Sequence, residues 1–395
     1  MLNQDKMEIK LKTLTPVHIG TGNTYGEAEF ITEDSKLRRI IFSRLYDSLS
    51  EEQKKKLLSE LEEKEFNLDE FVRKNKIRIS EDMILYSALM KSPPRRKIRE
   101  QIKTNNIPYL PGTSIKGAIR TALLWKYFMD DQSHFSDLIK SLKNELRGKV
   151  NKKKFVNRTV NKVFNLREDR FDAKYDILKF LQISDFISEE FNLEIVNVKT
   201  YSLKFGKFEE KHFDNFVEVL SVETTLKGTI SLNPQINYAL KNRREYPLLK
   251  NKLRIFSLRE DSMEDPKSVE DTMMMHIRKT LEEFNEWALE KERGLCDKAT
   301  DNRRFIKILG DIDPTDSIRL GFGVGTTYQT LIKMIEEKDI ELAKEIVNHP
   351  RLRLGRFSRK VDRRTGRELF PPYPKSIEFT QEGEPLGWLR FEEDD

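Results

Sequence analysis

Three glycine-bearing segments set the strongest limits on how this 395-residue chain can fold. They read TPVHIGTG from Thr15 to Gly22, PGTSIKGAIR from Pro111 to Arg120 and RLGFGVGTT from Arg319 to Thr327. Glycine weakens the interior of helices and strands, but it permits tight turns and close approach of two backbones. Each segment therefore predicts a bend, and the long regular elements must lie between these bends.

The composition argues against several classes of protein. No apolar run approaches the roughly 20 residues that a membrane helix needs, and the start MLNQDKMEIKLK lacks the apolar core of a signal peptide. The single cysteine, Cys296, excludes an internal disulfide and a thiolate zinc cluster, and the five histidines form no HxxxH or HxH pair. We therefore expect a cytoplasmic protein without a cofactor, a metal or a membrane partner.

Strand-like and helical stretches are intermixed along the chain, which predicts an α+β fold. The expected strands are 8–15, 28–31, 37–42, 216–232 with Gly228 as a possible bulge, 376–380 and 387–391. The expected helices are 44–74, a helix capped by Thr113 or Ser114, 271–292 and 331–347. We place a boundary near residue 250. Residues 1–250 form a core with helical insertions, and 251–395 complete that core or form a second unit.

The positive charge is concentrated in two stretches, although the whole chain carries only +6. Residues 140–170 contain eleven Lys/Arg and three Asp/Glu, and residues 351–367 contain eight Lys/Arg and one Asp. Clustered cations of this kind indicate contact with nucleic-acid phosphates. A solvated lysine-rich face is the alternative interpretation of either stretch.

We expect the three glycine segments to converge on a common groove, where they can present backbone N–H groups to the same polyanion. Gly112 precedes a helix whose first N–H groups can hold a phosphate, and Lys116 and Arg120 project from one face of that helix. The alternating glycines of the third segment leave the backbone uncovered. The alternatives are an ordinary capped helix and a structural turn.

Two single residues are further candidates. His18 can act as a general base or can simply hydrogen-bond the glycine turn beside it. Asp185 can cap or brace a loop at the end of the run DILKFLQISD.

Taken together, LTPVHIGTG, IPYLPGTSIKGAIRTAL, DILKFLQISD and RLGFGVGTT resemble the RAMP superfamily of CRISPR proteins. Their order and spacing, from Leu14 to Thr327, are most similar to the capping subunit of type III-A (Csm) effector complexes. The resemblance implies a modified RRM or ferredoxin-like fold with a glycine-rich loop and large helical insertions. It also implies a place at the end of a filament of backbone subunits, over the 3′ part of the crRNA.

The same resemblance implies a role in assembly and in crRNA 3′-end maturation rather than an active site. The partners are then the crRNA, target RNA, neighbouring RAMP backbone and small subunits, and host nucleases. Related subunits that cut RNA use an aspartate after the first glycine turn, and residues 23–29 contain none. The aromatic stretch of an RRM is also missing, so we expect backbone and shape contacts.

The residues expected to bind RNA are His18, Gly20, Thr21, Gly22, Gly112, Ser114, Lys116, Gly117, Arg120, Lys152, Lys153, Lys154, Arg158, Gly321, Gly323, Gly325, Arg351, Arg353, Arg356, Arg359 and Lys360. Two alternatives remain open. One is a metal-independent endoribonuclease with His18 as base, and the other is a scaffold that contacts only proteins.

Overall fold

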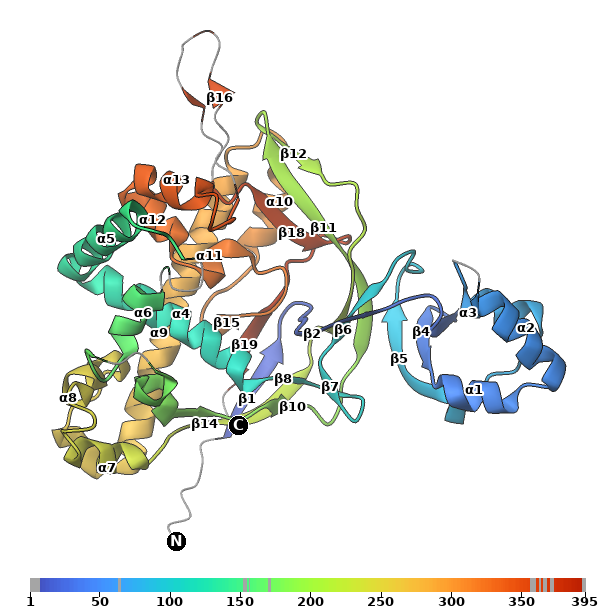
Figure 1. Cartoon of the computed structure of the whole chain (residues 1–395), viewed down its shortest axis with the longest axis horizontal. Helices are drawn as coiled ribbons and strands as arrows, with labels where there is room; N and C mark the ends of the chain where they lie inside the picture. The colour runs from blue at the N-terminus through green and yellow to red at the C-terminus, as the bar shows by residue number, and fades with distance from the viewer. Residues whose placement is uncertain are drawn as a thin grey trace.

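Two β-sheets built from strands far apart in the sequence organise the chain (Figure 1). The computed structural model describes residues 8–62, 65–151, 155, 157–169, 172–355, 360–361, 364, 368–369 and 373–392. The first sheet contains, in spatial order, β15 (Ser317–Arg319), β19 (Trp388–Glu392), β1 (Glu8–Thr13), β14 (Thr225–Leu232), β10 (Phe186–Ile187), β8 (Ile107–Leu110) and β7 (Lys103–Thr104), with β9 (Leu181–Ile183) paired to β14.

The second sheet lies beside the first and carries the long central strand β11. Its order is β2 (Gly20–Tyr25), β6 (Ile98–Gln101), β13 (Phe216–Leu220), β11 (Leu193–Lys204), β5 (Ile84–Met90), β4 (Lys36–Ile40) and β3 (Phe30–Glu33), and β12 (Lys207–Glu210) and β18 (Ser376–Thr380) also pair with β11. A separate pair of short strands is formed by β16 (Lys360–Val361) and β17 (Glu368–Leu369).

Helices cover the sheets and extend beyond them. They are α1 (Phe42–Ser48), α2 (Glu51–Leu61), α3 (Leu68–Lys74), α4 (Gly112–Asp130), α5 (Gln132–Arg147), α6 (Asn157–Phe164), α7 (Gln235–Lys241), α8 (Leu249–Lys252), α9 (Pro266–Cys296), α10 (Arg303–Gly310), α11 (Gly325–Gln329), α12 (Ile332–Lys338) and α13 (Ile340–Asn348). No helix in the described ranges is long and apolar enough to cross a membrane.

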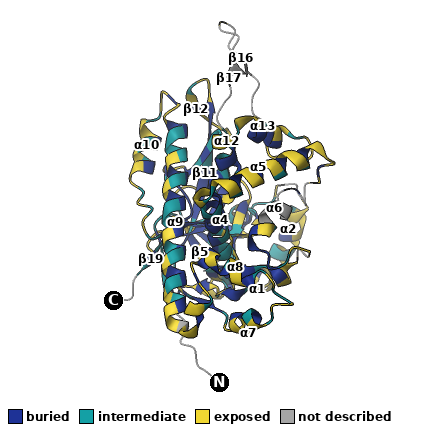
Figure 2. Cartoon of the chain, turned by 90° about the vertical axis from the view of Figure 1, so that its left-hand side faces the viewer, coloured by how far each residue is buried: buried dark blue, intermediate teal, exposed yellow. Residues whose placement is uncertain are grey.

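The long helix α9 and helix α4 form the helical half of the main core. Figure 2 shows buried and exposed faces alternating along α9, as expected for a helix with one side against the core. The ring of Trp125 on α4 lies 5.7 Å, centroid to centroid, from both Phe284 and Trp287 on α9. This aromatic cluster holds α4, and with it the second glycine segment, against the rest of the molecule.

Residues 30–90 form a small unit with its own core on one side of the molecule (Figure 1). The predicted helix 44–74 is three helices here. Ser50 caps α2 in a reciprocal capping box with Gln53, and the Asn67 side chain caps α3. These polar caps stop one helix and start the next, which the Lys/Glu/Leu pattern alone did not reveal.

The predicted strand 216–232 is two strands, and they belong to different sheets. β13 ends at Leu220 and β14 begins at Thr225, with Glu223 between them at a φ of 64°. The predicted bulge at Gly228 is wrong, because this residue pairs in regular register with Ile9. A Cβ at Gly228 would lie 2.4 Å from the ring of Phe186, so the glycine makes room for that ring.

The α+β class is confirmed, and the C-terminal strands join both sheets. β19 pairs with β1 in the first sheet, and β18 pairs with β11 in the second. The predicted helix 331–347 is divided at Asp339, whose side chain accepts a hydrogen bond from Leu342 N at 3.0 Å. The domain boundary near residue 250 stays a prediction.

Candidate nucleic-acid interface

The three glycine segments meet at one pocket, although 88 or more residues separate each from the next along the chain. The pocket has a volume of about 370 Å³. Its lining residues are His18, Ile19, Gly20, Ser114, Gly117, Ala118, Thr121, Arg319, Leu320, Gly321, Phe322, Val324, Tyr328 and Gln329. The expectation that separate bends come together around one hollow is therefore correct as geometry.

Direct backbone contact joins the third segment to the first. Phe322 N donates to His18 O at 2.9 Å, and Gly321 has a φ of 98°. A Cβ at Gly321 would lie 2.5 Å from His18 O. Only glycine combines this conformation with this close approach, so Gly321 fixes the position of the loop over the first segment.

His18 is buried beneath this contact. Its Nδ1 donates to Glu218 O at 2.6 Å on strand β13, rather than to its own turn. Burial lowers the pKa of His18 to about 4, although the bond to Glu218 acts in the opposite direction, and the positive charges of Arg99 and Lys103 lower it further. The imidazole is therefore neutral at pH 7 and serves as a structural link between two strands.

A buried carboxylate supports the same region from below. Glu218 accepts hydrogen bonds from Gln101 N at 3.0 Å, from Tyr25 OH at 3.2 Å and from the Lys103 ammonium. Gln101 in turn accepts from Ile19 N through Oε1 at 2.9 Å. A buried charge is tolerated when it is paired and fully hydrogen-bonded, so this network fixes β2, β6 and β13 relative to one another.

The second segment begins helix α4 in an unexpected way. The predicted cap by Thr113 or Ser114 is wrong, because Pro111 occupies the cap position and no side chain of the segment caps the helix. Instead Gly112 N donates to Asp185 Oδ1 at 2.9 Å, which confirms the prediction that Asp185 caps or braces a loop. A Cβ at Gly112 would lie 2.3 Å from Ile183 O, so this glycine packs against the 183–185 backbone.

Lys116 and Arg120 have partners within the chain. Lys116 Nζ donates to Leu181 O at 2.7 Å, and burial lowers the pKa of this lysine. Arg120 pairs with Asp176 at 2.5 Å and lies 4.2 Å from the ring centroid of Phe164. Both cations hold the DILKFLQISD run against α4. Their contact with phosphate stays a prediction.

A buried ion pair anchors the base of the glycine loop. Arg319 lies 2.7 Å from Glu292 of α9, and its Nε donates to Leu386 O at 3.1 Å. Its guanidinium also lies 4.4 Å from the ring centroid of Tyr328. Because the two charges neutralise each other, this arginine provides rigidity rather than free positive charge.

A basic loop that was not predicted from the sequence is connected to the pocket through strand β6. Residues 91–97 join β5 to β6, and Arg95, Arg96 and Lys97 are exposed there. Strand β6 continues to Arg99, whose guanidinium lies 5.2 Å from the ring centroid of Phe322. The signal was present in the run RRKIR after Pro93-Pro94, but it is too short to stand out in a chain with 35% charged residues.

A larger hollow of about 890 Å³ lies on the other side of the glycine loop. Gly323, Gly325, Leu354 and Gly355 contribute to its lining, so the second basic stretch begins at its rim. Arg353 is exposed, and Arg351 donates to Val150 O at 3.3 Å, which brings the two basic stretches together. The predicted side chains that lie outside the described ones are Lys152, Lys153, Lys154, Arg158, Arg356, Arg359 and Lys360.

The first segment forms an exposed edge strand. Thr21 lies on β2 and its hydroxyl donates to Glu100 at 3.3 Å, whereas Gly22 has a φ of 90° and no atom within 4 Å of a Cβ position. Gly20 lines the pocket itself. Gly20, Thr21 and Gly22 are therefore exposed. Their contact with RNA stays a prediction.

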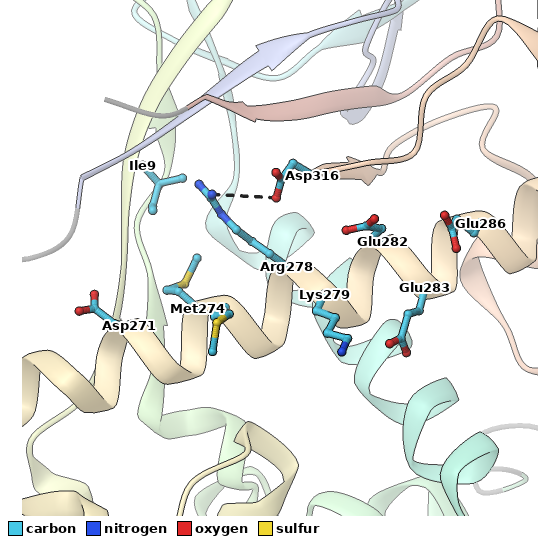
Figure 3. Close-up of a pocket in the computed structure, with 10 residues that line it drawn as sticks. Ile9, Asp271, Met274, Arg278, Lys279, Glu282, Glu283, Glu286 and Asp316 are labelled. Carbon is cyan, nitrogen blue, oxygen red and sulfur yellow. Dashed lines mark ion pairs between the residues drawn. The ribbon is translucent and has the colours of Figure 1, made fainter. Parts of the chain in front are cut away.

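A third hollow lies along α9, and its lining contains more acidic than basic residues (Figure 3). Its charged lining residues are Asp271, Arg278, Lys279, Glu282, Glu283, Glu286 and Asp316. Arg278 points toward Asp316 and pairs with it at 4.0 Å. Burial, with the surrounding carboxylates, raises the pKa of Glu282. This surface repels a polyanion, so RNA is expected on the glycine-lined side.

The described residues contain no cluster of three or more His, Cys, Asp or Glu side chains that could hold a metal ion.

Comparison with protein families gives one decisive match, because the model of the RAMP superfamily matches residues 10–328. The chain belongs to the RAMP superfamily. The match includes all three glycine segments.

Individual RAMP relatives are similar over most of the chain. Csm5 of Methanocaldococcus jannaschii, described as a CRISPR system Cms protein, is 25% identical over 352 residues, which are 84% of this chain and 74% of the relative. One chain of a type III-A Csm–crRNA–target RNA ternary complex has a TM-score of 0.65 at 21% identity, with 98% and 100% of the two chains covered. Csm5 of T. onnurineus has a TM-score of 0.61 at 19% identity, with 96% and 99% covered.

Proposed function

We propose that this RAMP protein is the crRNA-binding subunit that caps the 3′-end side of a type III-A CRISPR (Csm) ribonucleoprotein in the cytoplasm. It supports complex assembly and crRNA 3′-end maturation in antiviral defence. Its partners are the crRNA, target RNA, the neighbouring RAMP backbone and small subunits, and host nucleases that trim the crRNA. The relatives support this proposal, since one is named Csm5 and another is part of a Csm–crRNA–target RNA complex.

One observation carries the RNA-binding part of the proposal. The three glycine segments converge on a single pocket, and the exposed cations Arg95, Arg96 and Lys97 lie in the loop that precedes strand β6. Strand β6 leads from this loop to Gln101, which bonds the backbone of the first segment. Four residues of strand span roughly 13 Å, so one RNA strand can contact the loop and the pocket together.

The salt dependence of binding tests this path. Single-stranded RNA loses about 0.7 units of slope in log K against log salt for each cation removed. We expect the variant R95Q/R96Q/K97Q to have a slope about 2 units shallower than the wild type. From about 50 mM to about 200 mM salt, the wild-type affinity should therefore fall about 16-fold more than that of the variant.

A matched control removes the same charge elsewhere. Lys241, Arg244 and Lys267 are exposed near α7 and the start of α9, away from β5 and β6 in Figure 1. The variant K241Q/R244Q/K267Q should keep the wild-type slope. Equal slopes for the wild type and R95Q/R96Q/K97Q would refute the loop as a phosphate contact. No binding of guide RNA by the wild type would refute the RNA-binding function itself.

The endoribonuclease alternative depends on His18, and its environment is unfavourable for that role. A general base works best with a pKa near the operating pH, whereas burial lowers the pKa of His18 to about 4. Its Nδ1 is already bonded to Glu218 O. We therefore expect labelled repeat RNA to remain intact with the purified protein in EDTA. Discrete cleavage that His18→Ala abolishes would favour the enzyme.

A further inference from the structure

The glycine-lined pocket has an uncharged lining, although cations lie just outside it. Among its described lining residues, Arg319 is the single Lys or Arg, and it is buried against Glu292 at 2.7 Å. His18 is neutral at pH 7, as shown above. The pocket therefore lacks the free positive charge that a phosphate-binding site uses.

Four backbone N–H groups around the pocket have partners within the protein. Phe322 N donates to His18 O, Ile19 N to Gln101 Oε1, and Ser114 N to Pro111 O at 2.8 Å. Gly112 N is bound by the carboxylate of Asp185. Because these four donors have protein partners, they are not available to a phosphate.

The pocket instead offers an aromatic ring and neutral hydrogen-bonding groups. Phe322 contributes a partly buried ring, and Ser114, Thr121 and Gln329 contribute two hydroxyls and an amide. A flat heteroaromatic group satisfies both features, because its face stacks on a ring and its edge accepts and donates hydrogen bonds. In an RNA, that group is the nucleobase.

We propose that this pocket holds one unpaired nucleobase of the bound RNA, stacked against Phe322, while the flanking phosphates lie on the cations outside. The inference rests on the proposed RNA-binding function and adds to it the part of the nucleotide that enters the pocket. It changes the expected role of the glycine segments from holding phosphate to shaping a space for a base.

The position of the Phe322 ring is well defined, as a stacking platform requires. The His18 ring lies perpendicular to it at 5.8 Å, and the Arg99 guanidinium lies 5.2 Å from its centroid. The flanking glycines, Gly321 and Gly323, have φ values of 98° and 79°. A Cβ at Gly323 would lie 2.9 Å from Leu386, so the loop cannot shift freely around the ring.

Abasic scanning of the guide RNA tests the inference. Each nucleotide of the bound stretch is replaced in turn by an abasic site, and the affinity of the full-length protein is measured by fluorescence anisotropy. We expect one position to lose affinity about 5- to 150-fold, the range for loss of one base–aromatic stack. The other positions should change much less.

Variants at the platform identify which residue the base contacts. In Phe322→Leu, which keeps an apolar contact with the sheet, and in Phe322→Ala, the same abasic position should cost less than about twofold. Neither variant removes charge, so the salt slope should stay at the wild-type value. Tyr238→Ala, an exposed aromatic on α7, is the matched control and should keep the full abasic effect.

The outcomes separate the two levels of the argument. A flat abasic profile with intact RNA binding would overturn the base pocket and leave the proposed function standing. A sensitive position whose cost is unchanged in Phe322→Leu would also overturn it. Absence of RNA binding by the wild type would overturn the proposed function, and the base pocket with it.

Discussion

Gly117 offers the sharpest test of the glycine-lined surface, because one substitution should move stability and RNA binding in opposite directions. It lies in the second turn of α4, inside the helix where glycine is unfavourable, and it lines the pocket. No atom lies within 4 Å of the position that a Cβ would take. No contact within the described chain therefore explains why a glycine stands here.

The size of the stability effect follows from helix propensity. Replacing a mid-helix glycine by alanine gains about 1 kcal/mol when the new methyl group meets nothing. We therefore expect Gly117→Ala to raise the free energy of unfolding by about 1 kcal/mol. In a chain of this length, that corresponds to an increase in Tm of about 2 °C or less. Urea unfolding followed by circular dichroism measures it.

The binding effect has the opposite sign if RNA occupies the open space. The methyl group of alanine would then occupy space that the nucleotide fills, and a bulkier side chain would exclude the nucleotide from that space. We expect Gly117→Ala to weaken guide-RNA binding by about 1–3 kcal/mol, the usual cost of overpacking, and Gly117→Leu to weaken it more. Gly310→Ala on α10, also open, is the control that should leave binding unchanged. A stabilised Gly117→Ala protein with wild-type affinity would refute the reasoning.

Three further predictions concern stability. The His18 pKa of about 4 lies below its value of 6.5 in the unfolded chain, so the unfolded chain binds more protons between these two pH values. The free energy of unfolding should therefore fall by about 3 kcal/mol as the pH decreases from 6.5 to 4. His18→Gln should flatten this dependence, as measured by urea unfolding at several pH values. Asp185→Ala should lower the free energy of unfolding by about 1 kcal/mol, since it removes the cap on Gly112 N, and an unchanged urea midpoint would contradict this. The raised pKa of Glu282 means that its ionised form disfavours folding, so Glu282→Gln should raise Tm at pH 7 and lose this advantage near pH 4, with an equal gain at both pH values counting against the assignment.

The sequence predicted the elements whose pattern is local. Strand β1, the β3–β4 hairpin and helix α9 follow from alternation or from a helical stripe, and all three are present. It did not predict where those patterns stop. The stretch 216–232 has uniform β propensity, yet it divides between two sheets because residues 221–224 bond to strand β1 and its surroundings. Such partners are distant in sequence, and propensity contains no information about them.

At the candidate site, too, features that depend on local sequence were predicted, whereas contacts between distant residues were not. The three glycine segments predicted bends that would meet, because each leaves backbone N–H groups uncovered for the same polyanion. The type of ligand group could not be predicted in this way. Lys116, Arg120 and the start of α4 looked like phosphate ligands as isolated motifs, and their partners at Leu181, Asp176 and Asp185 became visible only in the fold.

The charged surfaces and the uncharged pocket should have different roles in RNA binding. We expect the acidic hollow on α9 to repel a polyanion and the basic loop 91–97 to attract it. At the pocket itself, Arg319 and His18 contribute no net charge. Removing loop cations should therefore alter the salt slope, whereas altering Phe322 or Gly117 should change affinity at a constant slope. A variant of Phe322 that changes the slope would show that the pocket binds phosphate after all.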